Sequence, residues 1–181
     1  MSAPLETERL LFRRPVASDV LDIFERYASD ADVTRYLAWP RHLSVDDTRT
    51  FIAFSDAEWA RWPAGPLLIV SRADGSLLGG TGIGFETRGR AITGYVLARD
   101  AWGRGYATEA LAAMVQLARA SGVERLSATC HADHLASWRV MEKCGFTREG
   151  LLRSHTVFPN LSDRPADVLL YSQILQPSAW T

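Results

Sequence analysis

The chain is predicted to form one α/β (α+β) domain in which helices flank a mixed β-sheet. Strand-like apolar runs separated by turns fill residues 66–98, a pattern typical of an antiparallel meander. After residue 98, helical and strand-like segments alternate, which adds parallel pairing to the sheet. The 181 residues, 47% hydrophobic and 23% charged, suit a single globular domain over residues 1–181 with a sizeable core.

An edge strand and two helices are predicted in the N-terminal third. Residues 5–14 alternate in part between apolar and polar and end at Pro15, which favours an edge strand. Residues 18–29 begin with Ser and Asp, which cap helices well, and then place apolar side chains on one helical face. A second helix is predicted over residues 44–62, where Pro63 ends it.

A meander of three strands follows. Residues 67–71 form a short apolar run, and Asp74-Gly75 is a turn pattern that joins it to a glycine-rich strand over residues 77–85. A further turn at residues 88–90 leads into a strand over residues 91–98.

The remaining chain alternates between helix and strand. Residues 105–120 carry an apolar stripe at helical spacing, and residues 123–130 read as a strand. A short helix is predicted over 134–144, then strands over 146–152 and 167–175. With the N-terminal edge strand, this order predicts one domain with a mixed sheet.

The stretch G-Y-V-L-A-R-D-A-W-G-R-G-Y-A-T-E-A-L, residues 94–111, predicts a phosphate-binding turn. An apolar strand leads to Gly103 and Gly105, and a helix starts at once. Glycine lets the backbone approach a ligand closely, and a helix start presents unpaired N–H groups at its positive end. Such a strand, turn and helix cradle anions, most often phosphate. A lone G-x-G would also fit a plain tight turn.

Charge and composition narrow the possible functions. The net charge of −1 provides no basic field for nucleic acid or for an anionic membrane. Apolar runs are too short to span a membrane, and residues 1–10 do not read as a secretory signal. Two cysteines, Cys130 and Cys144, do not make a disulfide framework, so we expect a cytoplasmic protein. No metal site is expected, because Cys130 and His131 alternate on a strand and point to opposite faces.

Three motifs in order identify a family. L-E-T-E-R-L-L-F-R, G-Y-V-L-A-R-D-A-W-G-R-G-Y-A-T-E-A-L and S-W-R-V-M-E-K-C-G-F together resemble the GNAT acetyltransferase superfamily, in particular the branch of the ribosomal-protein N-terminal (alanine) acetyltransferases. The resemblance covers nearly the whole chain. It implies a splayed, mixed sheet of six or seven strands flanked by helices, acetyl-CoA as the acetyl donor, and transfer of an acetyl group to an amine.

The resemblance also implies roles for individual residues. Backbone N–H groups of the glycine turn would hold the CoA pyrophosphate, with Arg104 near the phosphates, and strand 95–97 would meet the pantetheine amides. A backbone N–H of that strand, which we assign to Leu97, would polarise the acetyl carbonyl. Ser137 would face the thioester. The cofactor-binding residues implied are Tyr95, Val96, Leu97, Trp102, Gly103, Arg104, Gly105, Tyr106, Ala107, Thr108, His134 and Ser137.

Departures from the family pattern leave the proton transfers open. Ile92 stands where the branch usually has an acidic residue, His134 where it has asparagine, and Met141 where many members have the tyrosine that protonates the thiolate. Ser137, His134 or water are the candidate acids, although Ser137 also suits a helix cap. Glu86, which closes the strand beside that of Ile92, is our first candidate base. The alternative bases are Asp133, Glu149 and His155, and the alternative interpretation of Glu86 is a solvated turn carboxylate.

The acceptor is predicted only as a class. A lysine amine is neutral about 0.04% of the time at pH 7 and an α-amine roughly 10%, so an α-amine needs less help from a base. We expect a protein N-terminus or a small amine, attacked directly in a ternary complex, by a monomer or a homodimer. Tyr36, Trp39, Trp59 and Trp62 either wall an acceptor pocket or pack the early helices onto the sheet. The alternative function is a non-catalytic module that binds acyl-CoA to regulate a partner.

Overall fold

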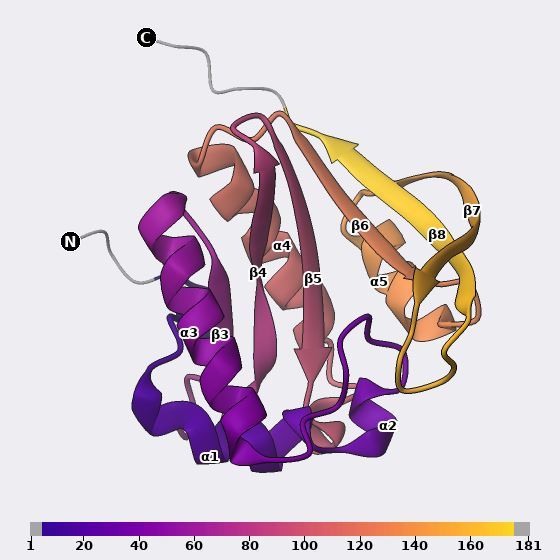
Figure 1. Cartoon of the computed structure of the whole chain (residues 1–181). Coiled ribbons are helices and arrows are strands. Elements are labelled where there is room, and N and C mark those ends of the chain that lie inside the picture. Colours follow the sequence, from indigo (N-terminus) through magenta and orange to yellow (C-terminus); the bar gives the residue numbers. More distant parts are fainter. Residues whose placement is uncertain (1–4, 176–181) are drawn as a thin grey trace, which may run out of the picture.

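The computed structural model of the protein describes residues 5–175, which build an eight-stranded mixed sheet with helices on both faces (Figure 1). The strand order is β1-β2-β3-β4-β5-β6-β8-β7. The strands are β1 (Leu5–Glu6), β2 (Leu10–Arg13), β3 (Pro66–Ser71), β4 (Leu77–Thr87), β5 (Arg90–Leu97), β6 (Arg125–His131), β7 (Thr147–Val157) and β8 (Pro165–Ile174).

The sheet is mixed, as predicted, because β5 and β6 run parallel while every other neighbouring pair is antiparallel. Pairing between β5 and β6 covers only Arg90–Ile92 against Arg125–Ser127. Beyond Ile92 the two strands diverge, and the sheet splays open. This divergence leaves one edge of β5 without a strand partner from residue 93 onward.

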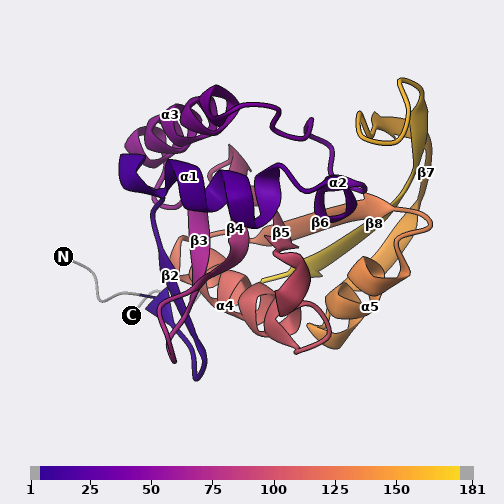
Figure 2. The ribbon, with the colours of Figure 1, turned by 90° about the horizontal axis from the view of Figure 1, so that it is seen from below.

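The helices cover the two faces unequally (Figure 2). On one face lie α1 (Val20–Ile23), α2 (Ala31–Thr34) and α3 (Val45–Arg61), and on the other lie α4 (Tyr106–Ala120) and α5 (Leu135–Lys143). Single turns of 3₁₀ helix occupy Ala17–Asp19 and Arg99–Ala101, and a π-helical turn occupies Phe24–Ala28.

Two details of the N-terminal third differ from the sequence-based expectation. The strand predicted over residues 5–14 is a hairpin, because a tight turn in which Thr7 N–H donates to the Leu10 carbonyl (2.9 Å) folds it back as β1 and β2. This split raises the count from seven to eight. The short helix α2 was not predicted, and it starts where the Asp30 side chain accepts the N–H groups of Asp32 and Val33.

Each face of the sheet has its own apolar core. Alternate residues of β3 divide between them, with Leu67 and Ile69 on the α4 side and Leu68 and Val70 on the α1–α3 side. The apolar stripe of α4 is buried in the first core, as its periodicity predicts. No helix among residues 5–175 combines the length and apolar character that crossing a membrane requires. Nor does this part of the chain gather three or more His, Cys, Asp or Glu side chains that could hold a metal ion.

Candidate functional site

The glycine turn adopts the conformation that an anion cradle requires. Gly103 has φ +73° and Gly105 has φ +79°, in the left-handed region that glycine tolerates best. Gly105 caps α4, and Glu109 N–H is the first to bond back, to the Gly105 carbonyl (3.1 Å). Within residues 5–175, the N–H groups of residues 103–108 therefore lack a protein acceptor. They lie where the sequence places the pyrophosphate contacts.

The open edge of β5 continues from this turn. Ala98 N–H points toward β4, since it donates to the Leu78 carbonyl (2.8 Å). N–H groups alternate between the two edges of a strand, so those of Tyr95 and Leu97 point toward the gap between β5 and β6. The carbonyl of Leu97 on this edge accepts the indole N–H of Trp102 (2.9 Å). The edge thus presents free N–H groups beside the glycine turn.

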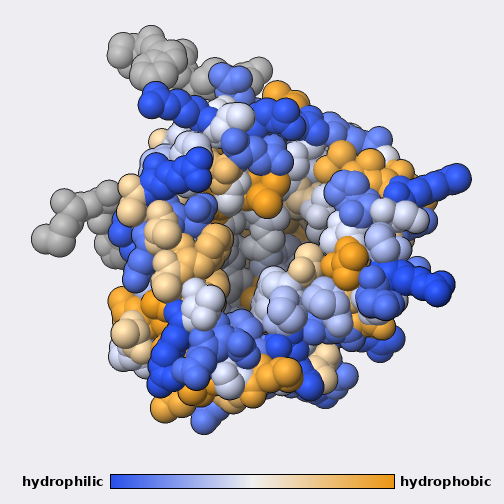
Figure 3. Space-filling model, in the orientation of Figure 1, coloured by the Kyte–Doolittle hydropathy of each residue, from blue (hydrophilic) through white to orange (hydrophobic). Residues whose placement is uncertain are grey.

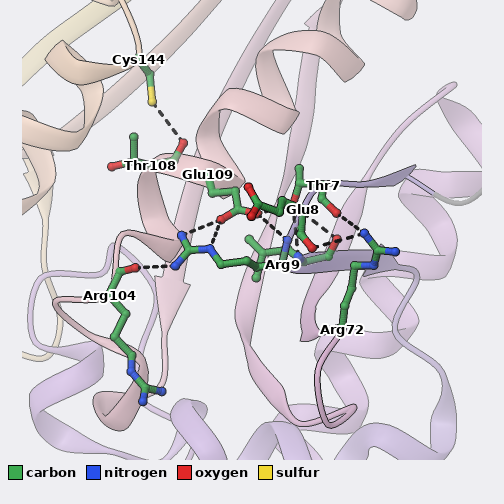
Figure 4. A network of polar contacts seen from close by, with 9 residues as sticks. Thr7, Glu8, Arg9, Arg72, Arg104, Thr108, Glu109 and Cys144 are labelled. Atoms are coloured by element: carbon green, nitrogen blue, oxygen red, sulfur yellow. Dashed lines mark hydrogen bonds and ion pairs between the residues drawn. The ribbon is translucent and has the colours of Figure 1, made fainter.

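A polar network anchors the turn from the N-terminal hairpin (Figure 4). The Arg9 guanidinium donates to the Glu109 carboxylate on the first turn of α4 (Nε–Oε2 2.7 Å) and to the Arg104 carbonyl (2.9 Å). Thr7 Oγ1 donates to the same carboxylate (2.6 Å). Only the carbonyl of Arg104 takes part, and its side chain points away from the network.

Ser137 and His134 lie together at the start of α5. The Tyr95 hydroxyl lies 3.1 Å from both the Oγ and the carbonyl oxygen of Ser137, which links β5 to α5 across the splay. No side chain caps α5, so the capping role considered for Ser137 is not observed. Burial, followed by the neighbouring His131, lowers the pKa of His134, so its imidazole is neutral at pH 7.

A cavity of about 880 Å³ opens on the α1–α3 side of the splay. In Figure 3 this face is hollowed at its centre, over β4 and β5. Tyr95, Val96, His134 and Ser137 line the cavity, whereas residues 102–108 lie outside its lining. Its floor includes three alternate residues of β4 that carry no side chain, namely Gly80, Gly82 and Gly84. Gly82 is required by packing, because a Cβ there would lie 2.7 Å from the Gly65 carbonyl oxygen.

The aromatic residues of the early helices divide between wall and core. Tyr36 and Trp39 line the cavity. Tyr36 also stacks on the His134 ring, with centroids 4.7 Å apart. Trp59 instead donates its indole N–H to the Pro66 carbonyl (2.8 Å), and Trp62 stacks on Phe85. Two of the four aromatic residues thus line the cavity, and the other two pack against neighbouring residues.

The loop between β7 and β8 supplies another part of the wall. Phe158, which is buried, lines the cavity and meets the His131 ring edge-on. Asn160 ties this loop to the segment around Trp39. Its side chain accepts from Arg41 N–H (2.8 Å) and donates to the carbonyls of Thr34 (2.8 Å) and Trp39 (2.9 Å). All three polar groups of this amide are therefore used.

None of the four groups considered as bases lines the cavity. Glu86 is at the far end of β4, 3.5 Å from Arg90, and it does not line the cavity. Glu149 is paired with Arg125 and Ser172. Asp133 is 82% exposed in the turn before α5. The remaining candidate, His155, is exposed on β7, where its ring contacts Thr156.

Two residues of this region were missed by the sequence analysis. Glu58 on α3 lines the cavity, and Asn160 joins two of its walls. Helical spacing offered a signal for Glu58, because Phe51, Phe54 and Glu58 share one face of α3. No sequence pattern points to Asn160, whose partners lie about 120 residues earlier in the chain.

Comparisons with known proteins agree with this architecture. The family model of the acetyltransferase (GNAT) domain matches residues 9–147. YoaA, an uncharacterized N-acetyltransferase of Bacillus subtilis (strain 168), is 32% identical in sequence, and the alignment covers 96% of this chain and 97% of YoaA.

Two solved structures have the same fold. A GNAT-family acetyltransferase from Bacillus anthracis has a TM-score of 0.82 at 26% identity, covering 95% of this chain and 98% of that one. RimL, a ribosomal L7/L12 α-N-protein acetyltransferase in complex with coenzyme A, has a TM-score of 0.83 at 23% sequence identity. The match covers 95% of this chain and 97% of RimL. The chain therefore belongs to the GNAT acetyltransferase family.

Proposed function

We propose that the protein is an acetyl-CoA-dependent N-acetyltransferase that acetylates a primary amine, either a protein N-terminal α-amine or a small molecule. The observation that carries this proposal is the continuity of three features. Free N–H groups at residues 103–108 adjoin the open edge of β5, and that edge borders the cavity on the α1–α3 side. A donor and an acceptor would thus meet at the splay from opposite sides.

The residues present fit acetyl-CoA. Two glycines with positive φ and six unpaired N–H groups suit a pyrophosphate, and the N–H groups of Tyr95 and Leu97 suit the amides of a pantetheine chain. The bound thioester would supply an acyl group activated toward amines. At the splay, the N–H of Leu97 or of its neighbour Tyr95 would stabilise the negative charge that develops on the carbonyl oxygen.

Direct attack in a ternary complex suits this site better than an acyl-enzyme. The cysteine that lines the cavity is Cys130, and burial raises the pKa of its thiol to about 11. At pH 7 only about one such thiol in ten thousand is a thiolate, which makes a poor nucleophile. The acceptor amine itself is therefore the attacking group in this proposal.

The proton transfers fall to few groups. His134, neutral at pH 7, is a better proton acceptor than donor. Ser137, held by the Tyr95 hydroxyl, or water would then protonate the departing thiolate. An α-amine, neutral roughly 10% of the time at pH 7, needs no strong base, and this supports a low-pKa acceptor. Glu86 does not line the cavity, so it would act as a base only through intervening water molecules.

Thiol release tests the proposal. Purified protein is mixed with acetyl-CoA and a panel of amines and N-terminal peptides, and free CoA is followed with time. We expect turnover that depends on the amine. Measurable CoA binding without turnover on any acceptor would instead favour the non-catalytic acyl-CoA-binding module.

A further inference from the structure

One helix face projects both aromatic and acidic side chains into the cavity. Asp47, Phe51, Phe54 and Glu58 recur three or four residues apart along α3, and all four line the cavity together with Thr50. The stripe is apolar in its middle and carries one carboxylate at each end. This arrangement is specific to the α1–α3 side, where an acceptor would enter.

The two carboxylates differ in their partners. Asp47 is engaged by the backbone at the start of α3, where its Oδ2 accepts the N–H groups of Leu43 (2.8 Å) and Ser44 (3.0 Å). Glu58 uses its backbone carbonyl to accept Trp62 N–H. Within the described residues its carboxylate makes no hydrogen bond or ion pair.

Glu58 is costly where it stands. Its side chain is half-buried, and burying a charge without a partner is unfavourable. It also lies in the last turn of α3, where the helix dipole opposes negative charge and favours cations. A positively charged ligand would supply the partner that this carboxylate lacks among the described residues.

The other residues that line the cavity indicate which chemical groups the rest of the ligand carries. Leu43, Phe54 and Ile92 also line the cavity, and they are 77%, 55% and 50% exposed. Large apolar side chains left exposed around a concave site are typical of a ligand surface. Of the other ionisable lining residues, Arg41 is cationic, whereas burial lowers the pKa values of His42 and His134. At pH 7 the lining thus carries one positive and two negative charges.

We propose that Glu58 binds the ammonium group of the acceptor, whose proton passes to this carboxylate or to water before the neutral amine attacks. The preferred acceptor is then a primary amine with an apolar or aromatic group nearby and no carboxylate beside the amine. This inference rests on the proposed N-acetyltransferase function and names its substrate class. A free amino acid is disfavoured, because its carboxylate would be repelled by Glu58. A peptide N-terminus with an apolar first residue, or an arylalkylamine, fits.

Three probes separate these requirements. Phenylalanine amide has the aromatic body and the α-amine, phenylalanine adds a carboxylate, and glycinamide lacks the apolar body. Steady-state thiol release with acetyl-CoA gives kcat and KM for each. We expect the wild type to use phenylalanine amide with a kcat/KM at least tenfold above that of either other probe.

The variant Glu58→Gln tests the residue, with Asp56→Asn as its matched control. Asp56 is exposed on the same helix and does not line the cavity. Glu58→Gln is expected to raise the KM for phenylalanine amide about tenfold or more, to leave the KM for acetyl-CoA within twofold, and to reduce the preference for the amide over phenylalanine. Asp56→Asn is expected to match the wild type. The melting temperature of Glu58→Gln is expected to be equal to or above that of the wild type, because an unpaired charge is removed.

Each contrary result has a definite meaning. An unchanged KM for phenylalanine amide in Glu58→Gln, or a lowered melting temperature, overturns the role of Glu58. A wild type that acetylates other amines but uses phenylalanine or glycinamide as well as phenylalanine amide overturns the substrate class, while the proposed function stands. If the wild type acetylates no amine, the proposed function fails and the inference fails with it.

Discussion

The guanidinium of Arg9 binds the carboxylate of Glu109, a residue one hundred positions later in the chain, with contacts of 2.7 Å and 2.6 Å to Oε2 (Figure 4). The same side chain holds the carbonyl of Arg104. The N-terminal hairpin therefore connects both sides of Gly105, and the first turn of α4 cannot shift without breaking this contact. Although burial opposes it, the hydrogen bonds from Thr7 and Arg9 lower the pKa of Glu109, so the carboxylate stays charged at neutral pH.

Arg9→Ala is expected to weaken CoA binding about tenfold, since the glycine turn loses charged hydrogen bonds that hold it. Arg72→Ala is the matched control, because Arg72 binds the same hairpin at the carbonyl of Thr7 (2.6 Å) without touching the turn. Calorimetric titration with CoA measures both. Equal affinities of the two variants and the wild type would show that the turn keeps its shape without Arg9.

Gly105→Val is expected to abolish tight CoA binding, because a β-branched residue is strained at φ +79° and crowds the cradle. Gly75→Val carries a comparable strain at φ +74°, in the turn between β3 and β4. Both variants should lose about 1–2 kcal/mol of unfolding free energy, measured by urea denaturation. Only Gly105→Val should lose CoA affinity, and an unaffected affinity would contradict the phosphate cradle.

Asn160→Ala is expected to raise the KM for the acceptor while leaving CoA affinity unchanged, because Asn160 joins the loop of Phe158 to the segment around Trp39. Losing two partly buried hydrogen bonds and one exposed hydrogen bond should also cost about 1–3 kcal/mol of stability. Ser162→Ala, in the same loop, removes only a bond to Arg164 N–H and serves as control. The KM for phenylalanine amide is measured for both variants. Equal KM values for Asn160→Ala and Ser162→Ala would refute this role.

Cys130 is expected not to carry the acetyl group. Because burial raises its pKa to about 11, the thiol is almost fully protonated at neutral pH. The intact mass of the protein after mixing with acetyl-CoA, without amine, should be unchanged. An acetyl adduct that disappears in Cys130→Ala would instead establish an acyl-enzyme.

Glu149 is expected to make stability depend on pH below the neutral range. Hydrogen bonds from Arg125 and then Ser172 lower the pKa of Glu149 from 4.5 to about 2. Because the folded-state pKa lies below the unfolded value, the stabilisation is fully present above about pH 4.5 and is lost as the pH falls toward 2. The melting temperature of the wild type should exceed that of Glu149→Gln at pH 6, and the two should converge near pH 2. A constant difference over this range would contradict the assignment, and added salt should reduce the difference because the pair is exposed.

The helices and strands were largely predictable because periodicity records which face of each element is buried. The capped start of α3 and the stripe of α4 lie where the pattern places them. The hairpin β1–β2 was read as one strand, since its turn at Thr7 has neither Gly nor Pro. Glu86 and Ile92 are near in sequence, yet Ile92 lines the cavity and Glu86 does not. An extended strand rises about 3.3 Å per residue, so a residue at the far end of β4 is carried away from the cavity.

The sequence alone identified the family, and it predicted the residues of the candidate donor site. That site is one continuous stretch, and its chemistry resides in the local backbone, where glycines and a helix start leave the N–H groups of residues 103–108 free. Only the tertiary structure decided the shape and charge of the acceptor cavity. Its walls come from α3, β4, β5 and the loop of Asn160, and a cavity between segments so far apart depends on packing that no single stretch of sequence encodes.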